Sequence, residues 1–340
     1  MDVQELNAIA RSIVADHKGV LAADESTGTI KKRFDSIGLE STEETRRAYR
    51  NLLFTTAGFE DYVGGVILYD ETIRQSADDG TPFPQLLESK GVVPGIKVDT
   101  GAQDLAGHPE EKVTEGLDGL RARFAEYHRL GARFSKWRGV ITIGDGIPTD
   151  ACLHVNAHAL ARYAALSQEA GIVPIVEPEV LMDADNTIER CHEVTSRTLQ
   201  LVFGELERQG VALEGMLLKP NMVIAGKHCA TQATPEQVAE QTIDCFLRHV
   251  PAMVPGIVFL SGGQSEVEAT ENLDAINKLG GPWPLSFSYG RALQASALSA
   301  WAGEPANVEE AQAVYLHRAR MNALAVAGDW SAGVEEAVPV

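Results

Sequence analysis

Short apolar segments that end in a polar residue recur along the chain, and they constrain its fold more than any other feature. They recur at intervals of about 40 residues, which is the length of one strand, one helix and their connections. We predict strands near residues 19–24, 64–69, 92–98, 132–138, 171–179, 215–221, 256–263 and 285–291. Because no linker or change of composition interrupts the alternation with helical patterns, we expect a single (β/α)8 TIM barrel of the α/β class.

Helical patterns also extend beyond the eight units at both ends of the chain. A helix over about 2–16 precedes the first strand, and helices over about 292–301 and 307–327 follow the last. We therefore predict one barrel domain over residues 1–340, with an N-terminal helix, extra C-terminal helices and a tail over about 328–340. Ser41 and Glu44 have the spacing of a capping box, which predicts a helix start there.

The charge balance argues against some classes of partner. The chain has 29 basic and 48 acidic residues and a formal net charge of -19, so we expect no nucleic-acid partner and no membrane surface. No apolar run approaches the roughly 18 residues of a membrane span, and the first residues lack a signal pattern. The 4 cysteines show no Cys-x-x-Cys spacing and are interpreted as reduced thiols. Together these features predict a cytoplasmic protein.

The carboxyl ends of the strands in such a barrel meet at one mouth, which is where active sites lie. The polar residues at these ends are Asp24, Lys97, Lys136, Arg138, Glu177, Glu179, Lys219, Ser261 and Arg291. Burial and neighbouring cations both disfavour a charged lysine, and a neutral amine can attack a ketone to form a Schiff base. The pattern of residues leaves Lys97, Lys136 and Lys219 open as the nucleophile.

The cations at the predicted mouth point to an anionic substrate, and two groups of residues are candidate phosphate sites. The first lies beside the last two strands, where barrels commonly bind phosphate, and consists of Ser261, Gly262, Gly290 and Arg291. The second joins Ser26 to the pair Lys32 and Arg33. As a run of charges, that pair also fits a solvated face.

Two other patterns carry little weight. His154 and His158 have the spacing of metal ligands on a helix, but the intervening glutamate of a zinc-protease helix and a nearby third ligand are missing. We therefore expect no metal and no other cofactor. The segment 260–264 resembles a signature of transporter ATPases, yet the only Gly-Lys pair, Gly226 and Lys227, lacks the first glycine of a phosphate loop.

Short motifs span nearly the whole chain: LAADES at 21–26, GIKVD at 95–99, KWR at 136–138, IVEPE at 175–179, LKPNM at 218–222, LSGGQ at 260–264 and FSYGRALQ at 287–294. In this order they resemble the motifs of the metal-independent, class I fructose-bisphosphate aldolases. The resemblance implies reversible cleavage of fructose 1,6-bisphosphate to dihydroxyacetone phosphate and glyceraldehyde 3-phosphate, in glycolysis and gluconeogenesis. It also implies a homotetramer.

The resemblance further implies a role for each residue at the mouth. Lys219 would be the Schiff-base lysine and Glu177 the acid and base of carbinolamine formation and dehydration. Lys136 would assist through its charge, and Asp24 would take the proton of the substrate hydroxyl when the carbon-carbon bond breaks. The phosphate next to the ketone would meet Ser261, Gly262, Gly290 and Arg291, the distal phosphate Arg33 and Ser26, and the central groups Lys97, Arg138 and Glu179.

The chain departs from the family pattern at its C-terminal end. The family commonly has a flexible tail with a terminal tyrosine that helps proton exchange at the enamine, whereas the last tyrosine here is Tyr315, inside a predicted helix. We therefore expect that truncation after Gly333 changes turnover little.

Two rival functions and the choice of substrate remain open. The rivals are another Schiff-base barrel enzyme of the transaldolase kind and a catalytically idle scaffold. The sequence does not choose among fructose 1,6-bisphosphate, fructose 1-phosphate and sedoheptulose bisphosphate.

Overall fold

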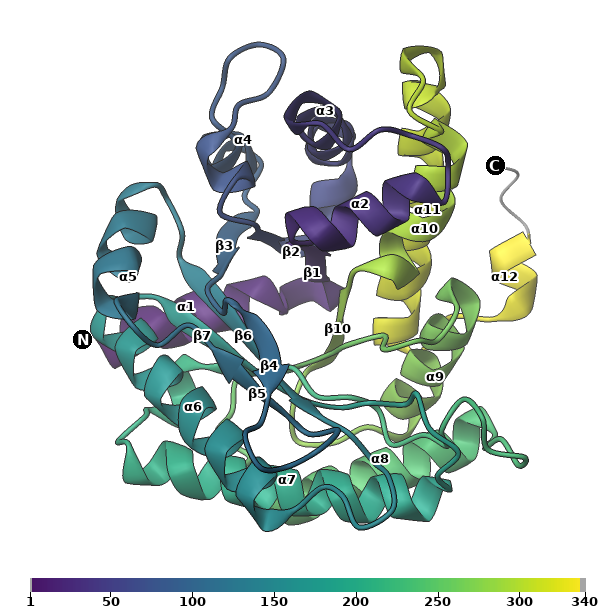
Figure 1. The fold of residues 1–340 in the computed structure, drawn as a ribbon. Coiled ribbons are helices and arrows are strands. Elements are labelled where there is room, and N and C mark those ends of the chain that lie inside the picture. The colour runs from purple at the N-terminus through teal and green to yellow at the C-terminus, as the bar shows by residue number, and fades with distance from the viewer. Residues whose placement is uncertain (1, 337–340) are drawn as a thin grey trace.

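Eight parallel strands form a closed barrel in the computed structural model, which describes residues 2–336 (Figure 1). The strands are β1 (Gly19–Ala23), β2 (Val63–Leu68), β3 (Val93–Lys97), β6 (Phe134–Ile141), β7 (Val173–Val180), β8 (Leu217–Leu218), β9 (Ile257–Phe259) and β10 (Leu285–Tyr289). Each strand pairs with the next in this order, and β10 closes on β1 with Val20 opposite Ser288. The predicted (β/α)8 barrel is therefore confirmed.

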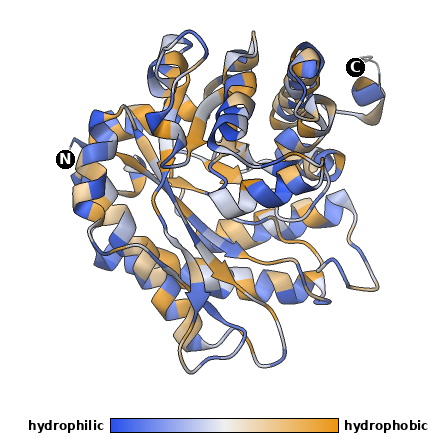
Figure 2. Cartoon of the chain, turned by 45° about the horizontal axis from the view of Figure 1, so that its top comes forward, coloured by the Kyte–Doolittle hydropathy of each residue, from blue (hydrophilic) through white to orange (hydrophobic). Residues whose placement is uncertain are grey.

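Helices surround this barrel on the outside (Figure 1). They are α3 (Glu43–Thr55), α4 (Phe83–Ser89), α5 (Leu120–Arg129), α6 (Asp150–Glu169), α7 (Ile188–Arg208), α8 (Pro235–His249), α9 (Glu266–Leu279), α10 (Arg291–Trp301) and α11 (Val308–Ala327). Two further helices differ: α2 (Thr27–Asp35) borders the mouth of the barrel, and α12 (Ala332–Glu336) is bound to α11. Figure 2 shows hydrophobic residues concentrated on the strands and the adjoining faces of the helices, with hydrophilic residues on the outer faces. Within residues 2–336, no helix combines the length and the apolar composition needed to cross a membrane.

The alternation of side chains along the strands places Lys219 inside the barrel. Leu217 belongs to the apolar cluster of the barrel interior, whereas Leu218 packs in the larger cluster beneath the helices. Although β8 is short, the amide of Lys219 still donates to the carbonyl of Val176 at 2.8 Å, so the pairing continues to this residue. Lys219 therefore lies on the face of Leu217, as the period of a strand predicts, and its side chain is buried.

The helix α1 (Val3–Ile13) closes the end of the barrel where the strands begin. Its buried residues Leu6 and Ile13 join the interior cluster that contains Phe134. A Cβ on Gly64 would lie 2.2 Å from the carbonyl oxygen of Ile13, so helix and strand approach as closely as the backbone allows. The predicted helix over 2–16 ends early, at Ile13, because Val14 leaves the helical conformation with a φ of -112° and a ψ of 13°.

The interior next to α1 is filled by the ring of Phe134. A Cβ on Gly95 would lie 2.3 Å from this ring, and one on Gly65 would lie 3.0 Å from it. Glycines in β2 and β3 therefore provide the space that a large side chain on β6 occupies.

An antiparallel hairpin, β4 (Gly101–Asp104) and β5 (Lys112–Glu115), is inserted between β3 and β6. It was not expected from the sequence because its first strand is largely exposed and polar and lacks an apolar alternation.

The start of α3 also differs from the prediction. The capping box uses Thr42 and Thr45 in place of Ser41 and Glu44, and the carboxylate of Glu44 instead pairs with Arg47 at 2.7 Å.

The predicted tail over 328–340 is in part a docked segment. Glu335 in α12 accepts hydrogen bonds from both terminal nitrogens of Arg318, each at 2.7 Å, and from the indole of Trp330 at 2.8 Å. Both Arg318 and Trp330 are buried. Truncation after Gly333 would therefore remove the partner of a buried guanidinium. The small effect of this truncation on turnover stays a prediction, and residues 337–340 of the predicted tail lie outside the described part.

Candidate active site

The predicted site residues all line one cavity of about 540 Å³ at the carboxyl ends of the strands. They are Asp24, Ser26, Arg33, Lys97, Lys136, Arg138, Glu177, Glu179, Lys219, Ser261, Gly262, Gly290 and Arg291. The residues come from seven of the barrel strands or from the loops and helices that follow them, so only the closed barrel brings them together. Their convergence follows from the geometry of parallel strands, whose carboxyl ends share one edge.

Four charged side chains form a continuous row at the bottom of this cavity. Lys136 Nζ lies 2.7 Å from Asp24 Oδ2 and 3.3 Å from Glu177 Oε2, and Lys219 Nζ lies 3.2 Å from Glu177 Oε1. The row therefore alternates in sign from Asp24 to Lys219. Glu177 therefore lies between the two lysines, with Oε2 toward Lys136 and Oε1 toward Lys219.

The alternation of sign fixes the protonation of two members of the row. Burial alone would raise the pKa of Asp24, but Lys136, Lys219 and Lys97 outweigh it and hold the pKa well below its ordinary value. Asp24 is therefore an ionised carboxylate at neutral pH, ready to accept a proton.

The pKa of Lys136 is shifted in the direction opposite to our expectation for a lysine among cations. Burial alone would lower its pKa, but the nearby carboxylates of Asp24, Glu177 and Asp99 raise the pKa above its ordinary value. Lys136 consequently remains a cation. The general expectation for a lysine among cations left out the closer carboxylates, whereas the role that the resemblance implies for Lys136, assistance through its charge, requires a cation.

Two further ion pairs border the row. Lys97 Nζ lies 2.6 Å from Asp99 Oδ1, and Arg138 donates to Glu179. Asp99 also lies 3.9 Å from Lys136. Asp99 was not among the predicted site residues, although the period of two after Lys97 placed it on the same face as the lysine.

The first candidate phosphate site combines a glycine loop with the start of α10. Gly262 has a positive φ of 58°, and its carbonyl accepts a hydrogen bond from Arg291 at 2.6 Å. Gly290 is the N-cap of α10, so the unpaired amides at the helix start lie beside Ser261 and Arg291 at the mouth. This arrangement of amides, a hydroxyl and a guanidinium suits a phosphate group.

Arg33 lies beside this first site and not beside Ser26 as expected. Its Nη2 is 3.5 Å from the position that a Cβ of Gly290 would occupy, and its Nη1 donates to Glu25. The difference arises because Arg33 stands near the C-terminal end of α2, whereas Ser26 is the N-cap of the same helix.

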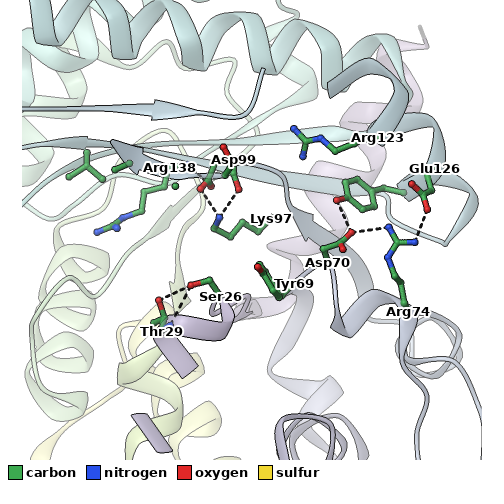
Figure 3. A pocket seen from close by; sticks show the side chains of 15 residues that line it. Ser26, Thr29, Tyr69, Asp70, Arg74, Lys97, Asp99, Arg123, Glu126 and Arg138 are labelled. Atoms are coloured by element: carbon green, nitrogen blue, oxygen red, sulfur yellow. Dashed lines mark hydrogen bonds and ion pairs between the residues drawn. The ribbon is translucent and has the colours of Figure 1, made fainter. Parts of the chain in front are cut away.

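The second candidate phosphate site opens into a neighbouring pocket of about 630 Å³ (Figure 3). The hydroxyls of Ser26 and Thr29 lie 3.1 Å apart at the start of α2, and Lys97 lines the same pocket. Figure 3 shows these side chains facing the pocket, with Asp70 and Arg74 on its far wall. Sequence reasoning missed Thr29, although a hydroxyl three residues after an N-cap serine was a readable signal.

The predicted absence of a metal site concerned His154 and His158. His158 Nδ1 lies 2.9 Å from Glu205 Oε2 on α7 and so links two helices. Within residues 2–336, His, Cys, Asp and Glu side chains form no group of three or more that could hold a metal ion.

A sequence model of the family described as "Fructose-bisphosphate aldolase class-I" matches residues 5–338. The chain belongs to this family. It is an aldolase of glycolysis, and the fold and activity implied by the motifs are confirmed. The transaldolase-like alternative and the idle scaffold are set aside.

Relatives of this aldolase match over nearly its full length. A protein named "Probable fructose-bisphosphate aldolase class 1" from Xanthomonas campestris pv. campestris is 56% identical over 97% of this chain and 99% of its own. "Fructose-bisphosphate aldolase 4, cytosolic" from Arabidopsis thaliana is 52% identical over 96% of this chain and 84% of its own. A crystal structure of fructose-bisphosphate aldolase from Plasmodium falciparum superposes with a TM-score of 0.96 at 50% identity, covering 97% of this chain and 96% of that one.

Proposed function

We propose that Lys219 forms the Schiff base through which this aldolase cleaves fructose 1,6-bisphosphate reversibly. The observation that carries this assignment is the position of Lys219 Nζ, which is buried in the barrel, 3.2 Å from a carboxylate oxygen of Glu177. A lysine must lose its proton before it can attack a ketone, and Glu177 is within reach to accept it. Lys97 and Lys136 also have carboxylate neighbours, Asp99 at 2.6 Å and Asp24 at 2.7 Å, so the preference for Lys219 over them rests on the resemblance to the family.

The first stage is formation of the imine. The amine of Lys219 adds to the ketone carbon, and the carbonyl oxygen takes a proton to give a carbinolamine. Loss of that oxygen as water leaves a protonated imine. Glu177 supplies and removes these protons, since its Oε1 lies 3.2 Å from the Nζ of Lys219, where the carbinolamine forms. Lys136 stabilises the negative charge on Glu177 from 3.3 Å away.

The second stage breaks the bond between the third and fourth carbons of the sugar. Asp24 takes the proton of the hydroxyl on the fourth carbon, which becomes the aldehyde carbon of glyceraldehyde 3-phosphate. The electron pair of the broken bond moves into the imine, which becomes a neutral enamine. Protonation of the enamine and addition of water then release dihydroxyacetone phosphate and restore the lysine. The low pKa of Asp24 keeps it ionised for this step.

The two phosphates occupy opposite ends of the mouth in this proposal. The phosphate next to the ketone binds Ser261, Gly262, Gly290 and Arg291, with Arg33 beside them. The distal phosphate binds Ser26, Thr29 and Lys97 at the neighbouring pocket. Arg138 and Glu179, which pair with each other, contact the central hydroxyls.

We further propose that the enzyme is a cytoplasmic homotetramer that acts on a phosphorylated sugar. The name of the Arabidopsis relative, which calls that protein cytosolic, supports the location. The tetramer rests on the resemblance of the motifs to the family.

Borohydride reduction in the presence of dihydroxyacetone phosphate tests the assignment of Lys219. We expect a reduced adduct on Lys219, found by mass mapping, both with and without a chelator. Lys219→Met should abolish the adduct, whereas Lys97→Met, the matched control, should still form it. An adduct on another lysine would reassign the nucleophile, and no adduct in the folded enzyme would overturn the mechanism.

A further inference from the structure

A buried ionic group stands behind the end of the mouth where Gly290 lies. Glu25 accepts one hydrogen bond from Arg33 and another from Arg50, the second at 2.5 Å from Nη2 to Oε2. The exposed fraction of the side chain is 4% for Glu25 and 3% for Arg50, but 20% for Arg33. The two arginines therefore share one carboxylate, and only Arg33 and Glu25 reach the cavity.

This group carries an excess of positive charge. One carboxylate compensates one guanidinium, so two guanidinium groups around Glu25 leave a net charge of about +1. Arg50 is closed off from solvent on α3, whereas Arg33 Nη2 faces Gly290. The uncompensated charge is consequently presented to the cavity by Arg33.

The group also leaves two hydrogen bonds unmade. Gln294 Nε2 donates to the carbonyl of Ala22 at 2.8 Å and to Glu25 at 3.3 Å, but Gln294 Oε1 and Arg50 Nη1 are buried without a partner. The hydrogen bonds that are made hold Glu25 between Arg33, Arg50 and Gln294.

We infer that Arg50 is a positioning residue for phosphate binding: it occupies one oxygen of Glu25 and thereby leaves the charge of Arg33 available to the phosphate next to the ketone. This inference rests on the proposed placement of that phosphate beside Gly290 and Arg33. Without Arg50, the pair of Glu25 and Arg33 is neutral. Both carboxylate oxygens then draw the guanidinium of Arg33 away from Gly290, and the attraction for a phosphate falls.

Inhibition by inorganic phosphate tests the role of Arg50 in the full-length enzyme. Arg50→Met should raise the inhibition constant of phosphate about tenfold, a change expected when one nearby charge is lost. Arg50→Lys keeps the charge, so it should raise the constant by less than about threefold. Borohydride trapping of dihydroxyacetone, which has no phosphate, should stay within about twofold of the wild type. If Arg50→Met does not fold, Arg50→Gln keeps a donor to Glu25 without the charge, and the same tenfold rise is expected.

Arg318→Met is the matched control because Arg318 is also a buried arginine paired with a glutamate, but lies away from the cavity. It should leave phosphate inhibition unchanged. A parallel loss of phosphate inhibition and dihydroxyacetone trapping in Arg50→Met would indicate a general structural defect and overturn the inference. Unchanged inhibition in Arg50→Met, while Arg33→Met weakens it, would overturn the inference and leave the proposed function intact. Unchanged inhibition in Arg33→Met would overturn the phosphate placement and the inference together.

Discussion

Replacement of Glu335 by glutamine tests how firmly the C-terminal segment is attached to the barrel. Glu335 is the partner of Arg318, whose side chain is 6% exposed, and it also binds the indole of Trp330. Glutamine keeps the shape and one acceptor oxygen but removes the charge. The guanidinium of Arg318 then remains buried without an anion, which destabilises the folded state.

The size of the effect follows from burial. Removal of one partner of a fully buried ion pair costs about 3–5 kcal/mol, but the side chain of Glu335 is 17% exposed, so water compensates part of the loss. With the hydrogen bonds that glutamine retains, we expect a decrease of about 2 kcal/mol in the free energy of unfolding. For a chain of 340 residues, an unfolding entropy of about 2.1 cal/mol/K per residue converts this into a fall in Tm of roughly 3 °C.

Thermal unfolding of Glu335→Gln, Arg318→Met and the double variant measures the coupling of the pair. The double variant should lose less stability than the sum of the two single losses, because no buried charge remains in it. Additive losses, or a Tm of Glu335→Gln within about 1 °C of the wild type, would refute the reasoning.

The effect of Glu335→Gln should also depend on pH. Burial would raise the pKa of Glu335, but Arg318, Trp330 and His317 hold the pKa below its ordinary value of 4.5. A lowered pKa means that the carboxylate stabilises the fold fully above 4.5 and loses this contribution as the pH falls through the folded-state pKa. The difference in stability between wild type and variant should therefore shrink in acid.

Three further predictions concern the barrel, the thiols and the row of charges. Gly95→Ala should destabilise the fold by about 1–3 kcal/mol in urea unfolding because the new methyl group meets the ring of Phe134, and unchanged stability would contradict this packing. At about pH 8, iodoacetamide should label Cys229 in the native enzyme but spare Cys152, because burial and a neighbouring carboxylate raise the pKa of the Cys152 thiol to about 12; denatured protein, in which both react, is the control. Asp24→Asn should lower kcat by the same factor at about pH 5.5 and about pH 8.5, since the depressed pKa keeps Asp24 ionised at both, and a ratio that approaches one in acid would show that it protonates.

The barrel and its mouth could be predicted because one repeated pattern determines both. An apolar segment with a period of two that ends in a polar residue predicts a strand. It also predicts which face of the strand points into the barrel and at which edge of the sheet the polar residue lies. Leu217 and Lys219 illustrate this, since the position of one inside the barrel fixes that of the other. The choice of Lys219 over the other lysines required the family resemblance.

The remaining features depend on distances that the sequence does not contain. The position of Arg33 beside Gly290 follows from the direction in which α2 leaves the mouth, and the raised pKa of Lys136 follows from carboxylates contributed by other strands. The hairpin of β4 and β5 gave no signal because an exposed strand needs no apolar alternation. The docking of α12 depends on Glu335 meeting Arg318 from another helix, 17 residues earlier in the chain.

The helix α1 covers the end of the barrel opposite the mouth, and this position determines how the enzyme can be attached to a surface. Leu6 and Ile13 hold this helix against the beginnings of the strands, and the exposed Asp2 caps its first turn. A tether or fused protein joined ahead of Asp2 therefore leaves from the side opposite the opening through which sugars diffuse. An immobilised enzyme linked in this way should keep the KM of the free enzyme, since the support neither covers nor crowds the entrance.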